Sequence, residues 1–268
     1  METLMSELFY KYRSIDSSVP INDDFAVNAL IGGYIKLSTR KEFNDVFDSQ
    51  VEIIQPTPKE MKLYFLENKK NWNKIFKNEK VVVKGKISPL GRKIIDYSIH
   101  EIEASLDENL LYCLSIKNNS NLMWSHYASN HYGFCIEFRF PKNPPDKVIY
   151  SKTVPKIKLT DYWSNNGNRR KIAQQIWQAL RNKLDEWSYE EEYRLQIPNE
   201  AKIKICPTGR GLSIKILEYS PESVESIIFG YRMTADTRKY IIKKYPSPMK
   251  FKEVVKLDSS LEVRDLKT

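Results

Sequence analysis

Cysteine, glycine and proline are scarce in this chain of 268 residues. Three cysteines are too few for a disulfide-stapled scaffold. Nine glycines and 13 prolines exclude collagen-like and low-complexity classes. No apolar run reaches the roughly 18 residues of a transmembrane helix, and no basic leader precedes an apolar stretch near Met1, so we expect no secretory signal. These absences favour a soluble cytoplasmic protein with reduced thiols.

Hydrophobic residues make up 41% of the chain and aromatic residues 12%, enough to bury a core and to exclude a disordered chain. The formal charge of +9 is spread unevenly. Residues 142–183 hold ten basic and two acidic side chains, a net charge of +8, and residues 67–86 have a net charge of +5. The sequence therefore predicts basic segments on a slightly acidic body.

The larger basic window also contains aromatic residues, among them Tyr150, Tyr162, Trp163 and Trp177. Cations interleaved with exposed rings suit a phosphate backbone with stacked bases. The alternative is a solvated basic face whose rings lie in the core. If the window contacts nucleic acid, we expect the contacts from Lys152, Lys156, Lys158, Trp163, Arg169, Arg170 and Lys171.

Hydrophobic periodicity predicts helices and strands in no regular alternation. We expect one α+β domain over residues 1–268, with a mixed, mostly antiparallel sheet, whole or split, flanked by helices. Strands are predicted over 8–13, 34–37, 110–116, 133–140, 189–197, 224–229 and 251–255, the last of these ending the core. Helices are predicted over 24–31, 58–76, 97–106, 122–129, 170–184 and 234–245. In the strand over 133–140, Phe134, Ile136 and Phe138 should face inward and Cys135 and Glu137 outward.

Glu190, Glu192 and Arg194 alternate along the strand predicted over 189–197, which places them on one face, about 7 Å apart. If that face lines a cleft, one carboxylate can hold a sugar hydroxyl or stabilise an oxocarbenium-like transition state while the other orients a nucleophile. Arg194 would keep both ionised. The alternative is a solvated strand with a weak ion pair.

Other polar groups give weaker signals. Lys11 and Arg13 share a face of the first strand, where two cations can hold a phosphate or a ribose, or can protect an edge strand from aggregation. His126 and His131 do not have the spacing of a metal site, so we expect no metal. Residues 44–48 are typical of a capped loop, or of a loop over a cleft. No phosphate-binding loop or dinucleotide fingerprint is present, which disfavours nucleotide triphosphatases and dehydrogenases.

Several ordered blocks are similar to those of a large bacterial family known only as a domain of unknown function. The blocks are Leu8–Ser14 (LFYKYRS), Glu42–Asp48 (EFNDVFD), Leu122–Ala128 (LMWSHYA) with Gly133–Phe138, Trp187–Arg194 (WSYEEEYR) and Ile227–Gly230. Together they are spread over most of the chain, from Leu8 to Gly230.

The order of these blocks also resembles a diverged ADP-ribosyltransferase. That resemblance implies an ADP-ribosyltransferase-like fold, with a first strand that supplies a cation (His in some relatives at the place of Lys11), a middle Tyr or Ser, and a late Glu. It implies catalytic roles for Glu190, Glu192 and Tyr127. It also implies binding of the substrate NAD by Lys11, Arg13, Ser125 and Arg194.

The resemblance suggests a bacterial toxin or antiphage effector that ADP-ribosylates nucleic acid, RNA or DNA, and that has an antitoxin or regulatory protein as a partner. Two alternatives remain open. The chain can be a non-enzymatic nucleic-acid-binding module, which rests on the basic window. It can also be a metal-dependent nuclease that uses Glu190 and Glu192.

Overall fold

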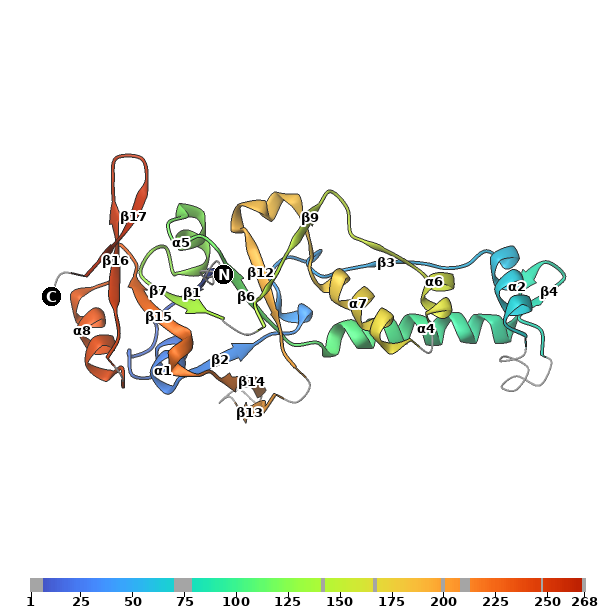
Figure 1. Ribbon diagram of the computed structural model, residues 1–268, viewed down its shortest axis with the longest axis horizontal. Helices are drawn as coiled ribbons and strands as arrows, with labels where there is room; N and C mark the ends of the chain where they lie inside the picture. The colour runs from blue at the N-terminus through green and yellow to red at the C-terminus, as the bar shows by residue number, and fades with distance from the viewer. Residues whose placement is uncertain are drawn as a thin grey trace, which may run out of the picture. The chain divides into compact units, whose positions relative to one another are not determined.

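The chain folds into two compact units in the computed structural model, which describes residues 7–69, 79–140, 143–165, 168–198, 201–207, 213–246 and 248–266 (Figure 1). Unit 1 comprises residues 1–38, 110–148 and 186–268, and unit 2 comprises residues 39–109 and 149–185. That these units form a single domain over residues 1–268 stays a prediction.

An eight-stranded sheet forms the centre of unit 1, in the order β17-β16-β15-β7-β1-β6-β12-β8. Neighbouring strands pair antiparallel except β15 and β16, which pair parallel. The prediction of an α+β protein with a mixed, mostly antiparallel sheet is therefore confirmed. The strands are β1 (Leu8–Arg13), β6 (Leu111–Ser115), β7 (Phe134–Arg139), β8 (Asp146–Lys147), β12 (Glu192–Gln196), β15 (Val224–Phe229), β16 (Phe251–Lys256) and β17 (Leu261–Asp265).

Helices cover both faces of this sheet. On one face, α1 (Phe25–Gly32) and α8 (Ala235–Lys244) contribute Leu30 and Ile241 to a core that includes Phe134 and Phe138. On the other face, α5 (Asn121–Tyr127) packs Met123 and Trp124 against Tyr10 and Tyr12. β1 thus directs Phe9 to the first face and Tyr10 and Tyr12 to the second.

The prediction that Cys135 and Glu137 of β7 face outward is wrong, because both side chains are buried. Strand alternation does point them away from Phe134, but α5 covers the second face at Cys135, and side chains of neighbouring strands surround Glu137. Cys135 packs in the core beside Trp124, and Glu137 is enclosed by polar partners from neighbouring strands. An alternating sequence pattern alone does not reveal this second layer.

The ends of α1 follow from its sequence. The Asp24 side chain accepts a hydrogen bond from the Val27 amide (2.8 Å), which caps the N-terminus. Gly33, at φ 68°, takes the left-handed conformation that ends the helix. The chain then enters β2 (Tyr34–Leu37), which forms a small antiparallel sheet with β14 (Ser213–Glu218) and β13 (Lys204–Pro207).

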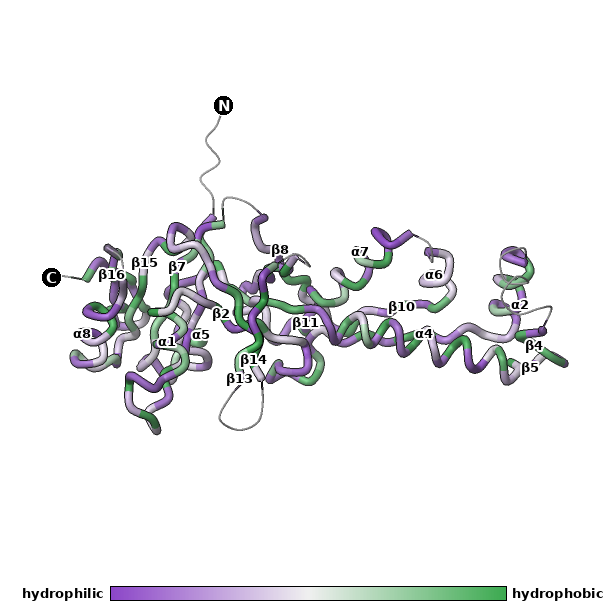
Figure 2. The backbone as a smooth tube through the Cα atoms, turned by 90° about the horizontal axis from the view of Figure 1, so that it is seen from below, coloured by the Kyte–Doolittle hydropathy of each residue, from purple (hydrophilic) through white to green (hydrophobic). Residues whose placement is uncertain are grey.

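The longest helix of unit 2 is α4 (Pro89–Glu108). Its buried residues include Ile94, Ile95, Ile102 and Leu106, at the spacing of one helical face, and Figure 2 shows apolar and polar turns alternating along it. The shorter helices are α2 (Pro58–Glu67), α6 (Leu159–Ser164) and α7 (Arg169–Leu180). The strands form the pairs β3 (Glu52–Ile54) with β10 (Lys156–Lys158), β9 (Ile149–Ser151) with β11 (Asn182–Leu184), and β4 (Val82–Val83) with β5 (Lys86–Ile87). The described residues also include the 3₁₀ turns η1 (Arg40–Glu42), η2 (Asp185–Glu190) and η3 (Pro221–Ser223).

Several predicted ends differ from the structure. The helix predicted over 170–184 ends at Leu180, and its last residues form β11. The helix predicted over 97–106 begins earlier, at Pro89, because Ser88 caps it (3.1 Å to the Gly91 amide). The helix predicted over 58–76 ends at Glu67, and Trp72, Ile75 and Phe76 lie outside the described residues. The core does not end with β16, because β17 pairs with it.

The described helices are short or amphipathic compared with the roughly 20 apolar residues of a membrane-spanning helix. None of them combines the length and the apolar composition that spanning a membrane requires.

Candidate functional site

Unit 1 brings Tyr127 and Glu190 together from opposite sides of a polar cluster. The Tyr127 hydroxyl, at the end of α5, donates a hydrogen bond to Oε1 of Glu190, the last residue of η2. The Glu190 carbonyl oxygen accepts a hydrogen bond from Oγ of Ser115 on β6 (2.6 Å). Glu190 is 3% exposed. The contacts fix this carboxylate between a helix and the central sheet.

Glu192 and Arg194 form a buried, bidentate ion pair on β12. Nε of Arg194 donates to Oε1 of Glu192 (2.8 Å), and Nη2 donates to Oε2 (3.1 Å). Glu192 is 4% exposed and Arg194 is fully buried. The ion pair of the solvated-strand interpretation is therefore present, but it is buried. We call Tyr127, Ser115, Glu190, Glu192 and Arg194 the acidic cluster.

The prediction of one continuous strand over 189–197 is wrong at its start. Glu190 lies in η2, and β12 begins at Glu192. Between them Glu191 takes φ 43°, which turns the chain and directs its side chain to Lys117 (2.7 Å). The turn, rather than strand alternation, brings Glu190 into the same buried region as Glu192.

Lys11 lies beside this cluster. Its ammonium donates to the carbonyl oxygen of Cys113 on β6 (2.8 Å) and lies 4.8 Å from the ring centroid of Tyr112. Desolvation lowers the pKa of Lys11, while the carboxylates of Glu192 and Glu190 oppose this lowering. Burial also raises the pKa of the Cys113 thiol, and the charge of Glu192 adds to the effect.

The strand registers place Lys11 and Glu192 on opposite faces of the sheet. Tyr10 pairs with Ser115, and Ser115 pairs with Glu192, so these three side chains share one face. Lys11 follows Tyr10 and projects from the other face, toward Tyr112. Lys11 therefore interacts with the carboxylates of the acidic cluster electrostatically, from the opposite face of the sheet, and does not line the same side of the sheet with them.

The other residues predicted to bind NAD lie in different surroundings. The Arg13 guanidinium is 6.0 Å from the ring centroid of Phe25 on α1. Oγ of Ser125 is 3.3 Å from Nε2 of His131. The structure thus joins Tyr127, Glu190, Glu192 and Arg194, and it places Arg13 and Ser125 with other partners.

The predicted nucleic-acid contacts belong to unit 2 and divide into two kinds. The six predicted cations are exposed: Lys152, Lys156, Lys158, Arg169, Arg170 and Lys171. One of them, Lys156, pairs with Glu52 (3.1 Å). Trp163 is buried, because its indole nitrogen donates to Oγ of Ser98 (2.8 Å) and its ring packs on Tyr64 (5.3 Å between centroids). The burial of Trp163 agrees with the alternative in which the rings of the basic window lie in the core.

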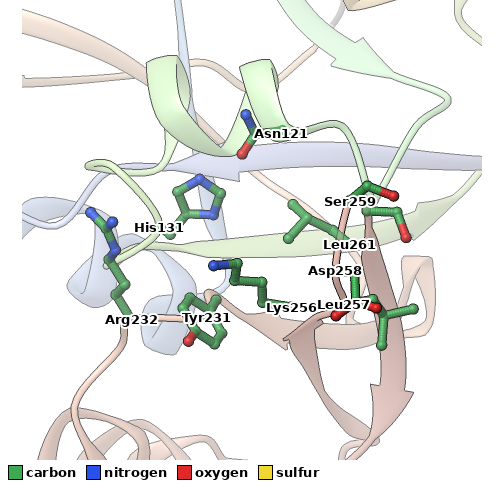
Figure 3. A pocket seen from close by; sticks show the side chains of 10 residues that line it. Asn121, His131, Tyr231, Arg232, Lys256, Leu257, Asp258, Ser259 and Leu261 are labelled. Atoms are coloured by element: carbon green, nitrogen blue, oxygen red, sulfur yellow. The ribbon is translucent and has the colours of Figure 1, made fainter.

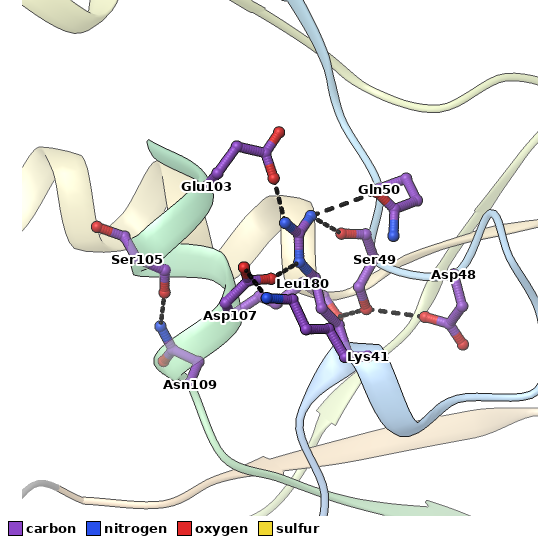
Figure 4. Close-up of polar contacts among 10 residues, drawn as sticks. Lys41, Asp48, Ser49, Gln50, Glu103, Ser105, Asp107, Asn109 and Leu180 are labelled. Atoms are coloured by element: carbon purple, nitrogen blue, oxygen red, sulfur yellow. Dashed lines mark hydrogen bonds and ion pairs between the residues drawn. The ribbon is translucent and has the colours of Figure 1, made fainter. Parts of the chain in front are cut away.

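The block over residues 42–48 has a structural role. Asp48 is buried, accepts a hydrogen bond from Oγ of Ser49 (2.8 Å) and pairs with Lys183 (3.4 Å). Close by, the Arg40 guanidinium joins Glu103 and Asp107 of α4 (Figure 4). These contacts hold the loop within unit 2. The capped-loop interpretation is supported by Asp45, whose Oδ1 accepts a hydrogen bond from the Phe47 amide (2.9 Å).

The two histidines that the sequence places near each other have separate partners. Nδ1 of His126 lies 2.9 Å from the Tyr189 hydroxyl, whereas His131 lies beside Ser125. Across the described ranges, no group of three or more His, Cys, Asp or Glu side chains is arranged to hold a metal ion. The nuclease alternative stays a prediction.

One buried polar group was not predicted from sequence. Glu137 on β7 accepts hydrogen bonds from Tyr10 (3.2 Å), Ser226 and Lys252 (2.6 Å). The sequence does show a carboxylate inside a strand that is otherwise largely apolar. When both faces of the sheet are covered, such a carboxylate is buried and needs hydrogen-bond partners. Its partners come from β1, β15 and β16, far from β7 in sequence.

Comparisons with known proteins concern one part of the chain. Neither a curated protein nor a solved structure matches it significantly. The sequence model of the family described as "Protein of unknown function (DUF2971)" matches residues 123–195. This stretch includes Tyr127, Glu190, Glu192 and Arg194, and excludes the blocks over 8–14, 42–48 and 227–230. Residues 123–195 thus carry a DUF2971 family domain, whose function is unknown.

Proposed function

We propose that this chain is an ADP-ribosyltransferase-like enzyme that transfers ADP-ribose from NAD to a nucleic acid. The observation that carries the proposal is the acidic cluster, in which two buried carboxylates each have their own donor. Tyr127 holds Glu190, and Arg194 holds Glu192. A buried carboxylate paired with a fixed cation stays ionised and oriented, as stabilisation of a positively charged transition state requires.

The proposed reaction breaks the bond between the nicotinamide nitrogen and C1′ of the ribose. Nicotinamide leaves as a neutral base with the bonding electron pair, and positive charge builds on C1′ and the ring oxygen. An acceptor oxygen or nitrogen forms the new bond to C1′ and loses its proton. The products are nicotinamide, the ADP-ribosylated acceptor and one proton.

The partners of the two carboxylates suggest different roles. Glu192 forms an ion pair with Arg194. We assign Glu192 to stabilising the positive charge that builds on the ribose. Glu190 is held by the neutral hydroxyl of Tyr127, and we assign it to receiving the acceptor proton. Tyr127 is then a positioning residue. Binding of NAD by Lys11, Arg13 and Ser125 stays a prediction.

The acceptor in this proposal is RNA or DNA. Its support is the set of exposed cations in unit 2, of which Arg169, Arg170 and Lys171 are consecutive at the start of α7. Lysine and arginine side chains bind the phosphate backbone of nucleic acids of any sequence, and this binding weakens as the salt concentration rises. A transferase that modifies nucleic acid fits a toxin or antiphage effector controlled by an antitoxin or regulatory protein.

The test incubates the full chain with NAD labelled in the adenylate part, with RNA, with DNA and without acceptor. Release of nicotinamide and transfer of label to nucleic acid are the expected results. Glu192→Gln should lower the rate by about 10²–10³-fold, the usual cost of removing one electrostatic stabiliser. The matched control is Glu191→Gln, since Glu191 pairs at the surface with Lys117. Undiminished turnover in both Glu190→Gln and Glu192→Gln, or no NAD consumption at all, contradicts the proposal.

The exposed cations also favour a second candidate, a nucleic-acid-binding module without catalysis. For this candidate the affinity for RNA or DNA should fall steeply between 50 and 200 mM salt, by about 10³-fold for six phosphate contacts. Replacing Arg169, Arg170 and Lys171 by glutamine should reduce that salt dependence. An affinity that is flat with salt rejects this candidate, and NAD turnover distinguishes it from the first.

A further inference from the structure

A cavity of about 560 Å³ lies in unit 1, and no residue of the acidic cluster lines it. Four segments bound it (Figure 3): Asn121 at the start of α5, the loop that carries His131, residues 231–232 after β15, and the turn 256–261 between β16 and β17. The lining is polar and comes from parts of the chain more than 100 residues apart.

His131 supplies a polar atom without a partner at this cavity. The residue is 9% exposed, and Nε2 lies 3.3 Å from Oγ of Ser125. The other ring nitrogen, Nδ1, is buried and has no hydrogen-bond partner in the described part of the chain. A buried polar atom without a partner is costly, so this nitrogen calls for a group that enters the cavity. Figure 3 shows the ring directed toward the same space as Lys256.

The charge of the lining defines the class of ligand. Arg232 and Lys256 both contribute cationic side chains, and Asp258 is the one carboxylate among the lining residues. No ion pair engages either cation within the ranges that the structure describes. Asn121, Ser259 and Ser260 add neutral donors. The lining therefore favours an oxyanion.

The ring of His131 acts here as a neutral donor. Burial lowers the pKa of His131, and the positive charge of Arg232 lowers it further, so the ring is neutral at pH 7. When the Ser125 hydroxyl donates to Nε2, the single ring proton is on Nδ1. Nδ1–H then donates to an oxygen in the cavity.

The backbone fixes this donor in place. His131 takes φ 73°, its amide donates to the Trp124 carbonyl (3.2 Å), and its carbonyl accepts from the Arg232 amide (3.0 Å). Gly230 packs against it so closely that a Cβ there would lie 2.2 Å from the His131 carbonyl oxygen. A donor that is positioned before the ligand arrives loses little entropy on binding.

We propose that this cavity binds the phosphate group of a phosphorylated small molecule. Arg232 and Lys256 balance the two negative charges of a phosphomonoester, and His131 donates to one of its oxygens. The volume is within the range of small-molecule sites. The exposed ring of Tyr231 offers apolar surface to the rest of the ligand. The proposal is independent of ADP-ribosyl transfer.

Calorimetric titration of the full chain tests the proposal with inorganic phosphate, ribose 5-phosphate and AMP, and with adenosine and acetate. We expect the three phosphates to bind and the other two compounds to be silent. Tighter binding of AMP or ribose 5-phosphate than of inorganic phosphate identifies an organic phosphate as the ligand. Arg232→Gln and Lys256→Gln should each lower the affinity tenfold or more, while the matched control Lys243→Gln, on the exposed side of α8, leaves it unchanged.

A second measurement keeps the proposal falsifiable if a variant misfolds. In the unmodified protein, the side-chain ¹⁵N resonance of His131 Nδ1 should shift on addition of the phosphate ligand, with little change for His126. The proposal is overturned if none of the three phosphates binds. It is also overturned if a phosphate binds but neither substitution weakens the binding and the His131 resonance does not shift. Glu192→Gln should not change phosphate binding, so the two proposals fail separately.

Discussion

Tyr127 and Glu190 are 63 positions apart in the chain, yet the hydroxyl of one donates directly to the carboxylate of the other. The contact joins the end of α5 to the last residue of η2. Beside it, the Ser115 hydroxyl on β6 donates a hydrogen bond to the Glu190 carbonyl oxygen (2.6 Å). It links the two ends of the stretch matched by the DUF2971 family.

Tyr127→Phe should therefore lower the stability of the folded chain. The variant removes one hydrogen bond to a charged group, which costs about 1.5–3 kcal/mol of unfolding free energy. Urea denaturation measures this loss. Tyr132→Phe is the matched control, because Tyr132 is 50% exposed. If Tyr127→Phe unfolds at the same urea concentration as the unmodified chain, the contact is not made in solution.

The pair of Glu192 and Arg194 should show strong coupling in a double-mutant cycle. Arg194→Met leaves a buried carboxylate without this cation, and such a change costs about 3–5 kcal/mol. The double variant Glu192→Gln with Arg194→Met should be more stable than Arg194→Met alone, because the neutral glutamine leaves no unpaired carboxylate at position 192. Unfolding free energies of the four proteins check this. Additive effects would mean that the two side chains do not interact.

Local elements of the fold could be predicted from the sequence, because their signals are local. The strands β1, β2 and β15 have the predicted bounds, and α1 (Phe25–Gly32) lies within one residue of the helix predicted over 24–31. Each depends on a short alternating pattern or on a capping residue next to the helix.

What lies on each side of an element could not be predicted in the same way. The sequence predicts an outward-facing Glu137 and leaves Trp163 either exposed or in the core, and both side chains are buried. The partners that bury them come from distant parts of the chain: Lys252 is 115 positions from Glu137, and Ser98 is 65 positions from Trp163. The position of Glu190 depends on the positive φ of Glu191, a conformation unusual for Glu. A charge pattern carries no information on these contacts.

Glu137 should make stability depend on pH. Burial alone would raise the pKa of Glu137, but the hydrogen bonds from Lys252 and Ser226 more than offset it and lower the pKa below the ordinary value of 4.5. A carboxyl with a lowered pKa stabilises the folded state above the unfolded pKa, and this contribution is lost as the pH falls through the folded pKa. Stability should therefore decline below about pH 4.5.

Glu137→Gln tests this assignment. At pH 7 the variant should be less stable by about 1–3 kcal/mol, because the partly buried Lys252 loses its anionic partner. As the pH falls below 4.5 and through the lowered pKa of folded Glu137, the difference between the two proteins should shrink, since Glu137 becomes protonated in the unmodified chain as well. Urea unfolding at pH 3.5, 5 and 7 measures it. The exposed Glu225, paired with Arg139 on the neighbouring strand, gives the control Glu225→Gln. A gap that is constant with pH would refute the role of Glu137.

Arg40 should be a main stabilising residue of unit 2. Its buried guanidinium donates to Asp107 (2.7 Å), to Glu103 and to the Ser49 carbonyl (3.3 Å), and so ties α4 to the loop after η1 (Figure 4). Burial raises the pKa of Asp107, but hydrogen bonds from Lys41 and Arg40 outweigh it, so the pKa lies below its ordinary value.

Arg40→Met should cost about 1–3 kcal/mol, less than a fully buried pair, because Glu103 is 39% and Asp107 21% exposed. Lys41→Met is a sharp control, since Lys41 pairs with the same Asp107 (2.6 Å) but is 69% exposed. It should change stability little. Hydrogen exchange of the α4 amides should quicken in Arg40→Met, while the amides of the unit 1 sheet keep their protection. Equal effects of the two variants on stability would show that the exposed and the buried partner of Asp107 contribute alike, and would contradict the special role of Arg40.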